Sequence, residues 1–356
     1  MDPAALRSQF PVLERLAYLN AGTDGPVPAA AVELARRELE LQLVEGRTNA
    51  HFERRFELQD ELRNGYGDVI GCRAEDVALM TSTSEGLGRV LAGMDLGPGD
   101  EIVTSDQEHP GLNGPLQAAQ GRGTRIRAVP LADVADAVGS QTTLVACSHV
   151  GWVSGELAPA ALAEVEVPVV LDGAQGAGAV PVDVGKLRCA AYSVSGQKWL
   201  CGADATGGLY IAPEFRERVR AIAPSYIAFE DPSRGLESPL KPDARRYDTP
   251  SLPREGVAFS VAALAVLRDA DFNAVLARGP LLADRLAERL AERGHTVAPR
   301  AHTTLVAWED DDAEATRDRL REVGVIVRNL PGRSLVRASV GAWSSDDDLE
   351  RLLDAL

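Results

Sequence analysis

The stretch "SVSGQKWLCGADATGGLYIAP", residues 193–213, joins two short apolar runs through a lysine and a glycine-rich turn. The residues before Lys198 are small and largely apolar, as in a buried strand, and Trp199 and Leu200 follow it directly. This flanking predicts that Lys198 lies inside a cleft, where burial lowers the pKa of an amine and makes it a usable nucleophile. A lysine at a strand end more often only keeps a surface soluble. The rest of the chain must therefore show whether Lys198 is catalytic.

Short apolar runs alternate with helical patterns on both sides of this stretch. The runs that predict strands lie at 76–82, 100–106, 124–130, 142–150, 167–175, 189–196 and 207–213. Such an alternation is typical of a mostly parallel sheet covered by helices. We therefore predict an α/β fold with a large domain built on a mostly parallel sheet of the seven-stranded type.

Near Arg254 the pattern changes to two long amphipathic helices, and then to strand, helix, strand, strand and helix. These segments lie at 256–270, 277–294, 303–309, 313–324, 325–330, 334–340 and 346–356. They predict a small C-terminal α+β domain. We expect an N-terminal segment, 1–19, that packs with the small domain, a large domain, 20–254, and a small domain, 255–356. The segment 225–255 is rich in Pro, Ser and charge, which is typical of a surface excursion near a cleft mouth or a subunit contact.

The composition narrows the kind of partner. The chain has 356 residues, 37 basic against 53 acidic, and a net charge of −16, with no cluster of Lys and Arg. This balance argues against nucleic acid and anionic membrane surfaces as partners, and we expect a small-molecule substrate. The first residues, "MDPAALRSQFPVLERLAYLN", show no secretion signal, and no apolar run is long enough to span a membrane, so we expect a cytoplasmic protein.

The cysteines indicate neither a metal site nor a disulfide framework. Cys72, Cys147, Cys189 and Cys201 stand far apart, with no CxxC spacing. We therefore expect no bound metal and predict that most of these thiols are ordinary core residues.

Polar side chains gather just after the predicted strands, where a sheet of this kind binds its ligands. They are Thr81, Ser82, Thr83, Ser84, Glu85, Glu108, His109, Ser148, His149, Trp152, Asp172, Gln175, Ser195, Gln197 and Lys198. Because the carboxyl ends of parallel strands meet at one edge of a sheet, we expect these residues to lie together. They would offer an anion cradle, two histidines, an acid with an amide, and an amine.

Two of these groups indicate a particular cofactor. Thr83 and Ser84, with the free amides that open the next helix, could bind a phosphate, although "TSTSEG" also fits a plain serine helix cap. Asp172 closes an apolar strand, where a carboxylate is costly unless it pairs with a cation such as a protonated pyridine nitrogen; a turn or cap aspartate is the alternative. Together with an aromatic ring and an amine, these groups are what a pyridoxal phosphate site requires.

Eight motifs carry a family resemblance over almost the whole chain. They are "YLNAGTDGPVP" (18–28), "TSTSEG" (81–86), "QEHPG" (107–111), "SHVGWVSG" (148–155), "LDGAQGAGAVPVDV" (171–184), "SVSGQKWLCGADATGGLYI" (193–211), "RRYDTPSLP" (245–253) and "VRASVGAW" (336–343). In this order the sequence resembles the class V aminotransferase family, which contains cysteine desulfurases, cysteine and cystine carbon–sulfur lyases and isopenicillin N epimerase. The resemblance implies the pyridoxal-phosphate-dependent transferase fold of type I and a homodimer with its sites at the interface.

The resemblance also implies a role for each site residue. Lys198 would form the Schiff base with the cofactor, His109 would stack on the pyridine ring, and Asp172 would hold the ring nitrogen. Gln175 would contact the phenolic oxygen, and Arg337 would bind the substrate carboxylate with its planar fork. The phosphate would be bound by Thr83, Ser84, Ser195 and Gln197, with Ser251 from the neighbouring subunit. Asn20 and Trp152 would complete the substrate side.

Departures from the family pattern bear on the reaction. The segment "VIVRNLPGRSLVRAS" (325–339) is short and has no cysteine, so persulfide transfer by the desulfurase route is not expected. Trp152 stands where desulfurases commonly have asparagine; it favours a different or bulkier substrate, or else simply packs on the cofactor edge. Gln197 replaces a histidine that desulfurases usually have before the lysine.

The reaction that we predict is β-elimination from an amino acid bound through an external aldimine, as in a cysteine or cystine carbon–sulfur lyase. An aminotransferase or an amino-acid epimerase is the alternative with the same site, because the sequence hardly separates these reactions. A non-catalytic regulator that binds pyridoxal phosphate is the remote alternative, and the retention of Lys198, Asp172, His109 and Arg337 argues against it.

Overall fold

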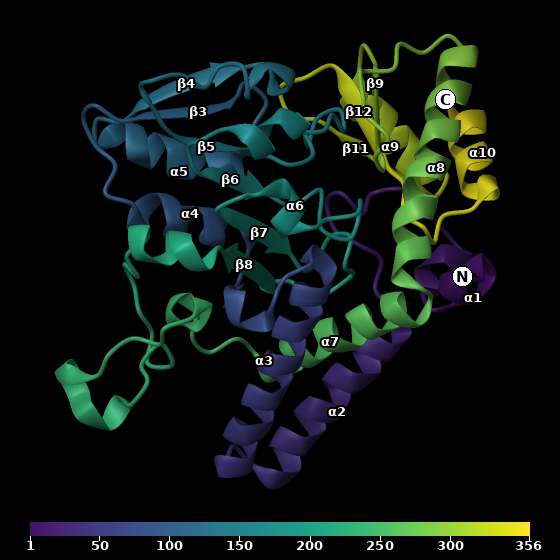
Figure 1. Ribbon diagram of the computed structural model, residues 1–356. Helices are drawn as coiled ribbons and strands as arrows, with labels where there is room; N and C mark the ends of the chain where they lie inside the picture. The colour runs from purple at the N-terminus through teal and green to yellow at the C-terminus, as the bar shows by residue number, and fades with distance from the viewer.

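Seven strands form the main sheet of the protein, whose residues 1–356 are all described by a computed structural model (Figure 1). Across the sheet the order is β2-β8-β7-β6-β5-β3-β4. The strands are β2 (Val77–Met80), β3 (Glu101–Ser105), β4 (Arg125–Val129), β5 (Thr142–Ser148), β6 (Val169–Asp172), β7 (Ala191–Ser195) and β8 (Gly207–Ile211). Only β8 runs against its neighbours, β2 and β7. The prediction of a mostly parallel sheet of seven strands is therefore confirmed.

Helices cover this sheet because its strands are apolar on both faces; every residue of β6, β7 and β8 is buried. The covering helices are α2 (Ala29–Glu45), α3 (Asn49–Ile70), α4 (Thr83–Gly93), α5 (Pro110–Gly121), α6 (Val184–Leu187) and α7 (Arg254–Asp269). Helix α7 packs against α2 and α3, below the sheet in Figure 1, and α4 packs against α5. Short 3-10 helices fill connections at Pro11–Glu14, Ala74–Asp76, Leu131–Asp133, Ala160–Glu164 and Pro213–Arg218.

A second, antiparallel sheet lies beside the first, at the upper right of Figure 1. Its order is β11-β12-β9, with β9 (Leu305–Glu309), β11 (Arg328–Asn329) and β12 (Leu335–Ser339). Helices α8 (Phe272–Glu292), α9 (Ala313–Glu322) and α10 (Asp346–Ala355) surround it. Trp308, Leu286 and Leu352 belong to a core cluster of its own. The α+β character predicted for this part is confirmed.

The single strand predicted over 325–330 is wrong, because the segment divides between two sheets. Its first half, β10 (Val325–Ile326), pairs in parallel with β1 (Ala17–Tyr18), whereas its second half is β11, the edge of the antiparallel sheet. The N–H of Leu19 donates to the carbonyl of Ile326, so the N-terminal segment satisfies hydrogen bonds that β12 does not reach.

The first residues of the chain lie against its last ones. Helix α1 (Pro3–Ser8) carries Arg7, whose guanidinium pairs with Asp348 of α10 and donates to the carbonyl of Trp343. Packing of the N-terminal segment against the C-terminal part thus follows from an ion pair and from β1. The domain boundaries at residues 19 and 254 stay a prediction.

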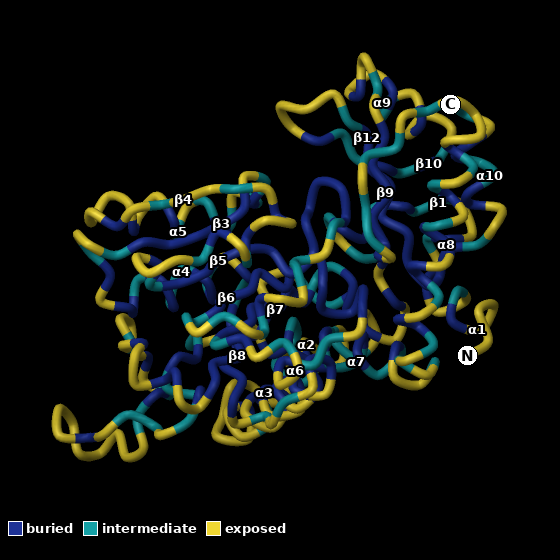
Figure 2. The backbone as a smooth tube through the Cα atoms, turned by 45° about the horizontal axis from the view of Figure 1, so that its top comes forward, coloured by how far each residue is buried: buried dark blue, intermediate teal, exposed yellow.

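The segment between β8 and α7 extends along the surface, at the lower left of Figure 1, and is largely exposed in Figure 2. It contains 3-10 helices at Pro232–Glu237 and Ala244–Tyr247, and the side chain of Leu236 is fully exposed. None of the helices in the protein is both long enough and apolar enough to cross a membrane.

Candidate active site

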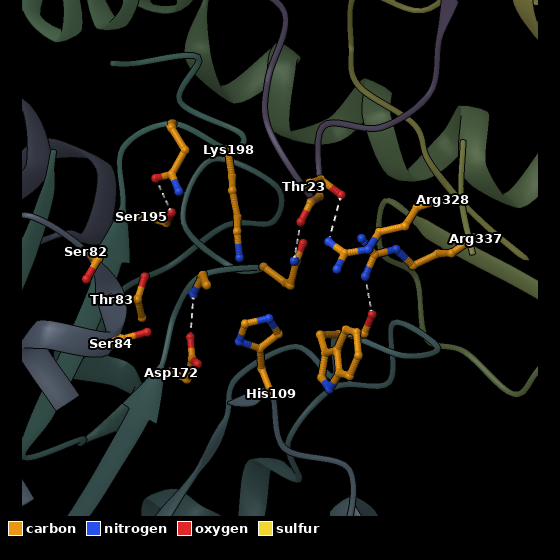
Figure 3. A pocket seen from close by; sticks show the side chains of 15 residues that line it. Thr23, Ser82, Thr83, Ser84, His109, Asp172, Ser195, Lys198, Arg328 and Arg337 are labelled. Carbon is orange, nitrogen blue, oxygen red and sulfur yellow. Dashed lines mark hydrogen bonds between the residues drawn. The ribbon is translucent and has the colours of Figure 1, made fainter. Parts of the chain in front are cut away.

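A cavity of about 220 Å³ opens beyond the carboxyl ends of the main sheet, between it and the antiparallel sheet (Figure 3). All predicted site residues line it except Asn20 and Ser251. Those present are Thr83, Ser84, His109, Trp152, Asp172, Gln175, Ser195, Gln197, Lys198 and Arg337. The expectation that polar residues after separate strands meet at one edge therefore agrees with the geometry for these residues and Ser82. The other residues named with them, Thr81, Glu85, Glu108, Ser148 and His149, do not line this cavity.

Lys198 points into the centre of this cavity from the turn after β7 (Figure 3). Burial lowers the pKa of its ammonium group to about 8; Asp172 opposes that shift and Arg337 adds to it. The turn is fixed by the N–H of Gly25, which donates to the carbonyl of Gln197 over 2.7 Å. A Cβ on Gly25 would collide with the carbonyl oxygen of Lys198, so only glycine allows this approach.

Asp172 ends β6 and is buried. Its Oδ1 accepts a hydrogen bond of 2.9 Å from the backbone N–H of Ala174, which orients the carboxylate toward the cavity edge. Burial raises the pKa of this carboxyl group, and Lys198 opposes the shift. A carboxylate buried in this way calls for a cationic partner in the cavity.

The hydroxyl groups at the other side of the cavity come from the start of α4. Ser82 is the helix cap, since its Oγ accepts from the N–H of Glu85 over 3.1 Å. The serine cap that this motif also indicated is thus present at Ser82, which leaves the hydroxyl groups of Thr83 and Ser84 free for another role. The hydroxyl of Thr83 is buried without a hydrogen-bond partner, beside amides that α4 leaves free. This arrangement suits a phosphate group.

Ser195 and Gln197 face the same side of the cavity. The hydroxyl of Ser195 donates to Oε1 of Gln197 over 2.8 Å, so the two side chains hold one another in place. The Nε2 group of Gln197 is not engaged in any hydrogen bond within the chain. Gln197 can therefore turn its Nε2 donors toward an anion at the start of α4, whereas Ser195 could donate to that anion only after releasing Gln197.

His109 caps α5 and presents its ring to the cavity (Figure 3). Its Nδ1 accepts from the N–H of Gly111 over 3.0 Å, so in the neutral ring the proton is on Nε2. Burial, together with Lys198 and the arginines of the cavity, lowers its pKa to about 4. The ring meets Trp152 edge to face, with centroids 5.1 Å apart. His109 is thus a neutral, braced aromatic surface at neutral pH.

Two arginines form the opposite end of the cavity, and they lie directly across from each other on β11 and β12. Arg337 is completely buried; its Nη1 donates to the carbonyl of Trp152, while Nε and Nη2 have no partner. Burial and the nearby Arg328 lower the pKa of Arg337 to about 9. Arg328 donates to the hydroxyl of Thr23 over 3.1 Å. Because no carboxylate of the chain pairs with either arginine, this end is suited to an anionic ligand.

Three predicted residues have other contacts. Gln175 lines the cavity, but its Nε2 donates to the carbonyl of Gly22 over 2.7 Å and its Oε1 accepts from Trp199 over 3.0 Å. Asn20 lies outside the lining, and its Oδ1 accepts from Thr23 over 2.8 Å. Ser251 is exposed, at a backbone φ of 58°, also outside this chain's cavity. The roles predicted for these three stay predictions.

Sequence reasoning missed Arg328 and Thr23 as lining residues, and it grouped Ser82 with the polar strand ends without giving it a role. Ser82 and Thr23 lie inside motifs in which the neighbouring residues carried the prediction. Arg328 had a usable signal: "VIVRN" and "LVRAS" flank a Pro-Gly turn, and pairing them as a hairpin sets Arg328 against Arg337.

Comparisons with known proteins agree with this geometry. The model of one protein family, described as "Aminotransferase class-V", matches residues 18–352. An isopenicillin N epimerase from Streptomyces clavuligerus is 27% identical over 385 residues, covering 95% of this chain and 93% of that protein. The cysteine desulfurase CsdA from Escherichia coli (strain K12) is 28% identical over 397 residues, covering 100% of this chain and 97% of that protein.

The fold is likewise shared with solved structures. A cystine C-S lyase, C-DES, in complex with its reaction product cysteine persulfide superposes with a TM-score of 0.88 at 25% identity, covering 97% of this chain and 98% of that one. A C-DES variant with glycine covalently linked to its pyridoxal phosphate cofactor gives the same TM-score at 24% identity, covering 98% of each chain.

Proposed function

Because the chain belongs to the class V aminotransferase family, a family of enzymes that use pyridoxal phosphate on amino acids, we propose that it catalyses β-elimination, cleaving a carbon–sulfur bond. One observation carries this proposal. The same cavity holds Lys198, whose ammonium pKa is lowered, and an end lined by Arg328 and Arg337 that contains no cysteine. Lys198 can remove a proton from the α-carbon of an amino acid, and the two arginines can bind its carboxylate.

The cavity offers partners for the phosphate, the ring nitrogen and the aldehyde carbon of pyridoxal phosphate. The buried, unpartnered hydroxyl of Thr83 and the free amides of α4 would hold the phosphate, with Ser84, Ser195 and Gln197 beside them. Asp172 would take the ring nitrogen, which satisfies a carboxylate that burial otherwise penalises. His109 would cover the ring, and Lys198 would hold the aldehyde carbon.

The cofactor, when bound, supplies an electron sink for negative charge that develops at the substrate α-carbon. Asp172 keeps the ring nitrogen protonated, which that task requires. Arg337 binds the substrate carboxylate through its free Nε and Nη2, and so orients the α-hydrogen relative to Lys198. With a pKa near 8, Lys198 is partly neutral at neutral pH, so its Nζ can take that proton. Loss of the β-substituent as a thiol or persulfide completes the elimination.

Direct elimination is favoured over transfer to an enzyme thiol by the position of the cysteines. Cys201 lies three residues after Lys198, but it is buried and its thiol has a pKa raised far above the usual value by that burial. Cys147 and Cys189 are buried as well. The turn between β11 and β12, next to Arg337, contains no cysteine. The thiols of the chain are thus unsuited to attack a sulfur atom at the substrate end.

Amino-acid epimerisation and transamination remain the second candidates. The observation that favours epimerisation is the likeness to the isopenicillin N epimerase over almost the whole chain. Both reactions use the same proton transfer at Lys198 and differ only in where the proton returns.

We further propose a cytoplasmic homodimer in which Ser251 of each subunit reaches the phosphate of the other. The exposure of Ser251, away from its own chain's cavity, supports this arrangement. Sedimentation of the holoenzyme should give a dimer, and dilution to the monomer should weaken cofactor binding.

The reaction is tested by incubating the holoenzyme with a panel of amino acids, including cysteine and cystine, and following three products. Release of pyruvate with thiol or persulfide indicates elimination, pyridoxamine phosphate indicates transamination, and loss of optical rotation without either indicates epimerisation. Substituting each cysteine by serine should leave elimination within about tenfold of the wild-type rate, a change of about 1.4 kcal/mol in barrier. A serine variant that binds substrate but no longer releases sulfur would contradict direct elimination.

A further inference from the structure

The residues just before Ser251 are bound firmly to the edge of the main sheet. The N–H of Thr249 donates to the carbonyl of Leu79 over 2.9 Å, and Oδ1 of Asp248 accepts from the N–H of Leu79 over 2.8 Å. Asp248 also accepts two hydrogen bonds, of 3.0 and 2.9 Å, from the buried guanidinium of Arg63. Residues 248–249 are therefore attached to the edge strand β2 by one backbone bond and one side-chain bond at Leu79.

The carboxylate of Glu85 joins this anchored segment to the start of α4. Its Oε1 accepts from the hydroxyl of Thr249 and from Arg89, and its Oε2 accepts from both the N–H and the hydroxyl of Thr81, each over 2.7 Å. Burial opposes ionisation of Glu85, but the bonds from Thr249, Thr81 and Arg89 outweigh it and lower its pKa. One charged group thus holds both the phosphate-binding turn, residues 81–84, and the segment that carries Ser251.

Ser251 depends on this anchor for its position. Its φ of 58° lies in the left-handed region, which residues other than glycine seldom adopt, so the turn is kept by what precedes it. The bond between Glu85 and Thr249 is the side-chain contact that ties this turn to the cavity's hydroxyl groups.

We propose that Glu85 is a positioning residue that couples the two cofactor sites of the dimer. This inference rests on the proposed dimer, in which one phosphate contacts the α4 start of one subunit and Ser251 of the other. A phosphate bound at the first site fixes Ser251 of the second subunit, and through Thr249 and Glu85 it orders that subunit's own α4 start. The second cofactor then binds to a cradle already arranged, which gives positive cooperativity.

The experiment is a titration of the cofactor-free dimer with pyridoxal phosphate, followed by absorbance and by calorimetry rather than by activity. The wild-type protein should bind with a Hill coefficient between 1 and 2, the second site about fivefold to tenfold tighter than the first. Thr249→Val removes the hydroxyl that reaches Glu85, and it should bring the coefficient to 1 while the protein stays dimeric. Thr249→Ser keeps the hydroxyl and should restore cooperativity.

Thr143→Val is the matched control, because it also removes a threonine hydroxyl that donates to a carboxylate. That bond, to Asp100 over 2.8 Å, lies away from the cavity. It should leave cooperativity as in the wild type. Non-cooperative binding by the wild-type dimer, or unchanged cooperativity in Thr249→Val, would overturn the coupling. A protein that binds no pyridoxal phosphate, or binds it equally well after Ser251→Ala, would instead refute the function or the dimer arrangement on which the coupling rests.

Discussion

The two ends of the cavity are built in different ways. The cofactor end comes from consecutive strand ends of the main sheet, and its groups are held by short local bonds, such as that from Ala174 to Asp172. The substrate end comes from the antiparallel sheet, and Arg337 there reaches the cavity with two donor groups that no residue of the chain satisfies. Most groups of the cofactor end are thus held by the chain itself, with the phosphate side completed by Ser251 in the proposed dimer, whereas the substrate end is completed by what binds to it.

This difference separates two kinds of specificity. The groups around Lys198 and Asp172 recognise a cofactor, and they are positioned mainly by the main sheet, with Gly25 of the N-terminal loop bracing the Lys198 turn. The arginines recognise an anion, and their distance from Lys198 depends on how two separately packed sheets meet. We therefore expect substitutions at the cofactor end to change kcat, and those at the substrate end to change KM.

Lys198→Ala should have the largest effect, because it removes both the covalent anchor and the proton acceptor. Turnover should fall by about four orders of magnitude, and the absorbance of the Schiff base should give way to that of the free aldehyde. Pyridoxal phosphate should still bind through its phosphate, as equilibrium dialysis can measure. The check is borohydride reduction of the wild-type holoenzyme followed by mass spectrometry. A cofactor adduct on a lysine other than Lys198 would refute the assignment.

Asp172→Asn should lower kcat by about a hundredfold to a thousandfold with little change in KM, because the ring nitrogen loses the charge that keeps it protonated. The measurement is steady-state kinetics with the best substrate of the panel. Asp172→Glu keeps the charge and serves as the companion variant. An Asn variant that retains most of the wild-type rate would mean that Asp172 does not hold the ring nitrogen.

Arg337→Ala should raise KM by about a hundredfold and Arg328→Ala by about tenfold, because a charged hydrogen bond contributes about 1.5–3 kcal/mol. The effects are unequal since Arg337 is completely buried and Arg328 already donates to Thr23. Arg333 is exposed in the turn between β11 and β12, so Arg333→Ala is the control and should leave both KM and kcat unchanged. If both arginine variants instead lost kcat equally, the expectation that the substrate end controls KM and the cofactor end controls kcat would be wrong.

The last effect concerns the stability of the folded protein rather than its kinetics, and it is absent at neutral pH. His149 is buried, with Nδ1 2.9 Å from the hydroxyl of Tyr192, and burial lowers its pKa to about 4. In the unfolded chain its pKa is about 6.5, so between pH 6.5 and 4 the unfolded state binds the proton and the folded state does not. Stability should therefore fall by about 3 kcal/mol as the pH drops through this window.

Urea unfolding of the cofactor-free protein at several pH values measures that loss. His149→Asn should show a shallower decline than the wild type, whatever its stability at pH 7. The same slope in both proteins would show that other groups dominate the acid response.

Much of this architecture could be predicted because it is local. Each strand of the main sheet is a short apolar run, and the carboxyl ends of such strands meet at one edge, so Lys198, Asp172, His109 and Thr83 could be grouped from the amino-acid sequence alone. The cap at Ser82 could not be separated from one at Thr83 or Ser84, because all three hydroxyls suit a helix start.

What escaped prediction depends on partners far apart in the sequence. The division of 325–330 into β10 and β11 requires β1, which begins at Ala17. The bond that holds Arg328 at the cavity likewise comes from the distant Thr23, although its register against Arg337 is set within a local hairpin. Apolar periodicity records which face of a segment is buried, but not which distant strand covers its edge.

The pairing of β1 with β10 also sets the order in which the protein can be completed during synthesis. Ala17 emerges from the ribosome early, yet its partner Val325 follows some 300 residues later, about 15–60 s at common elongation rates of roughly 5–20 residues per second. Meanwhile the whole main sheet, which ends at Ile211, has been made. The loop with Gly22 and Thr23 can thus close over Lys198 only after Val325 has been made. Until then the cavity stays open on the side where the substrate carboxylate will bind.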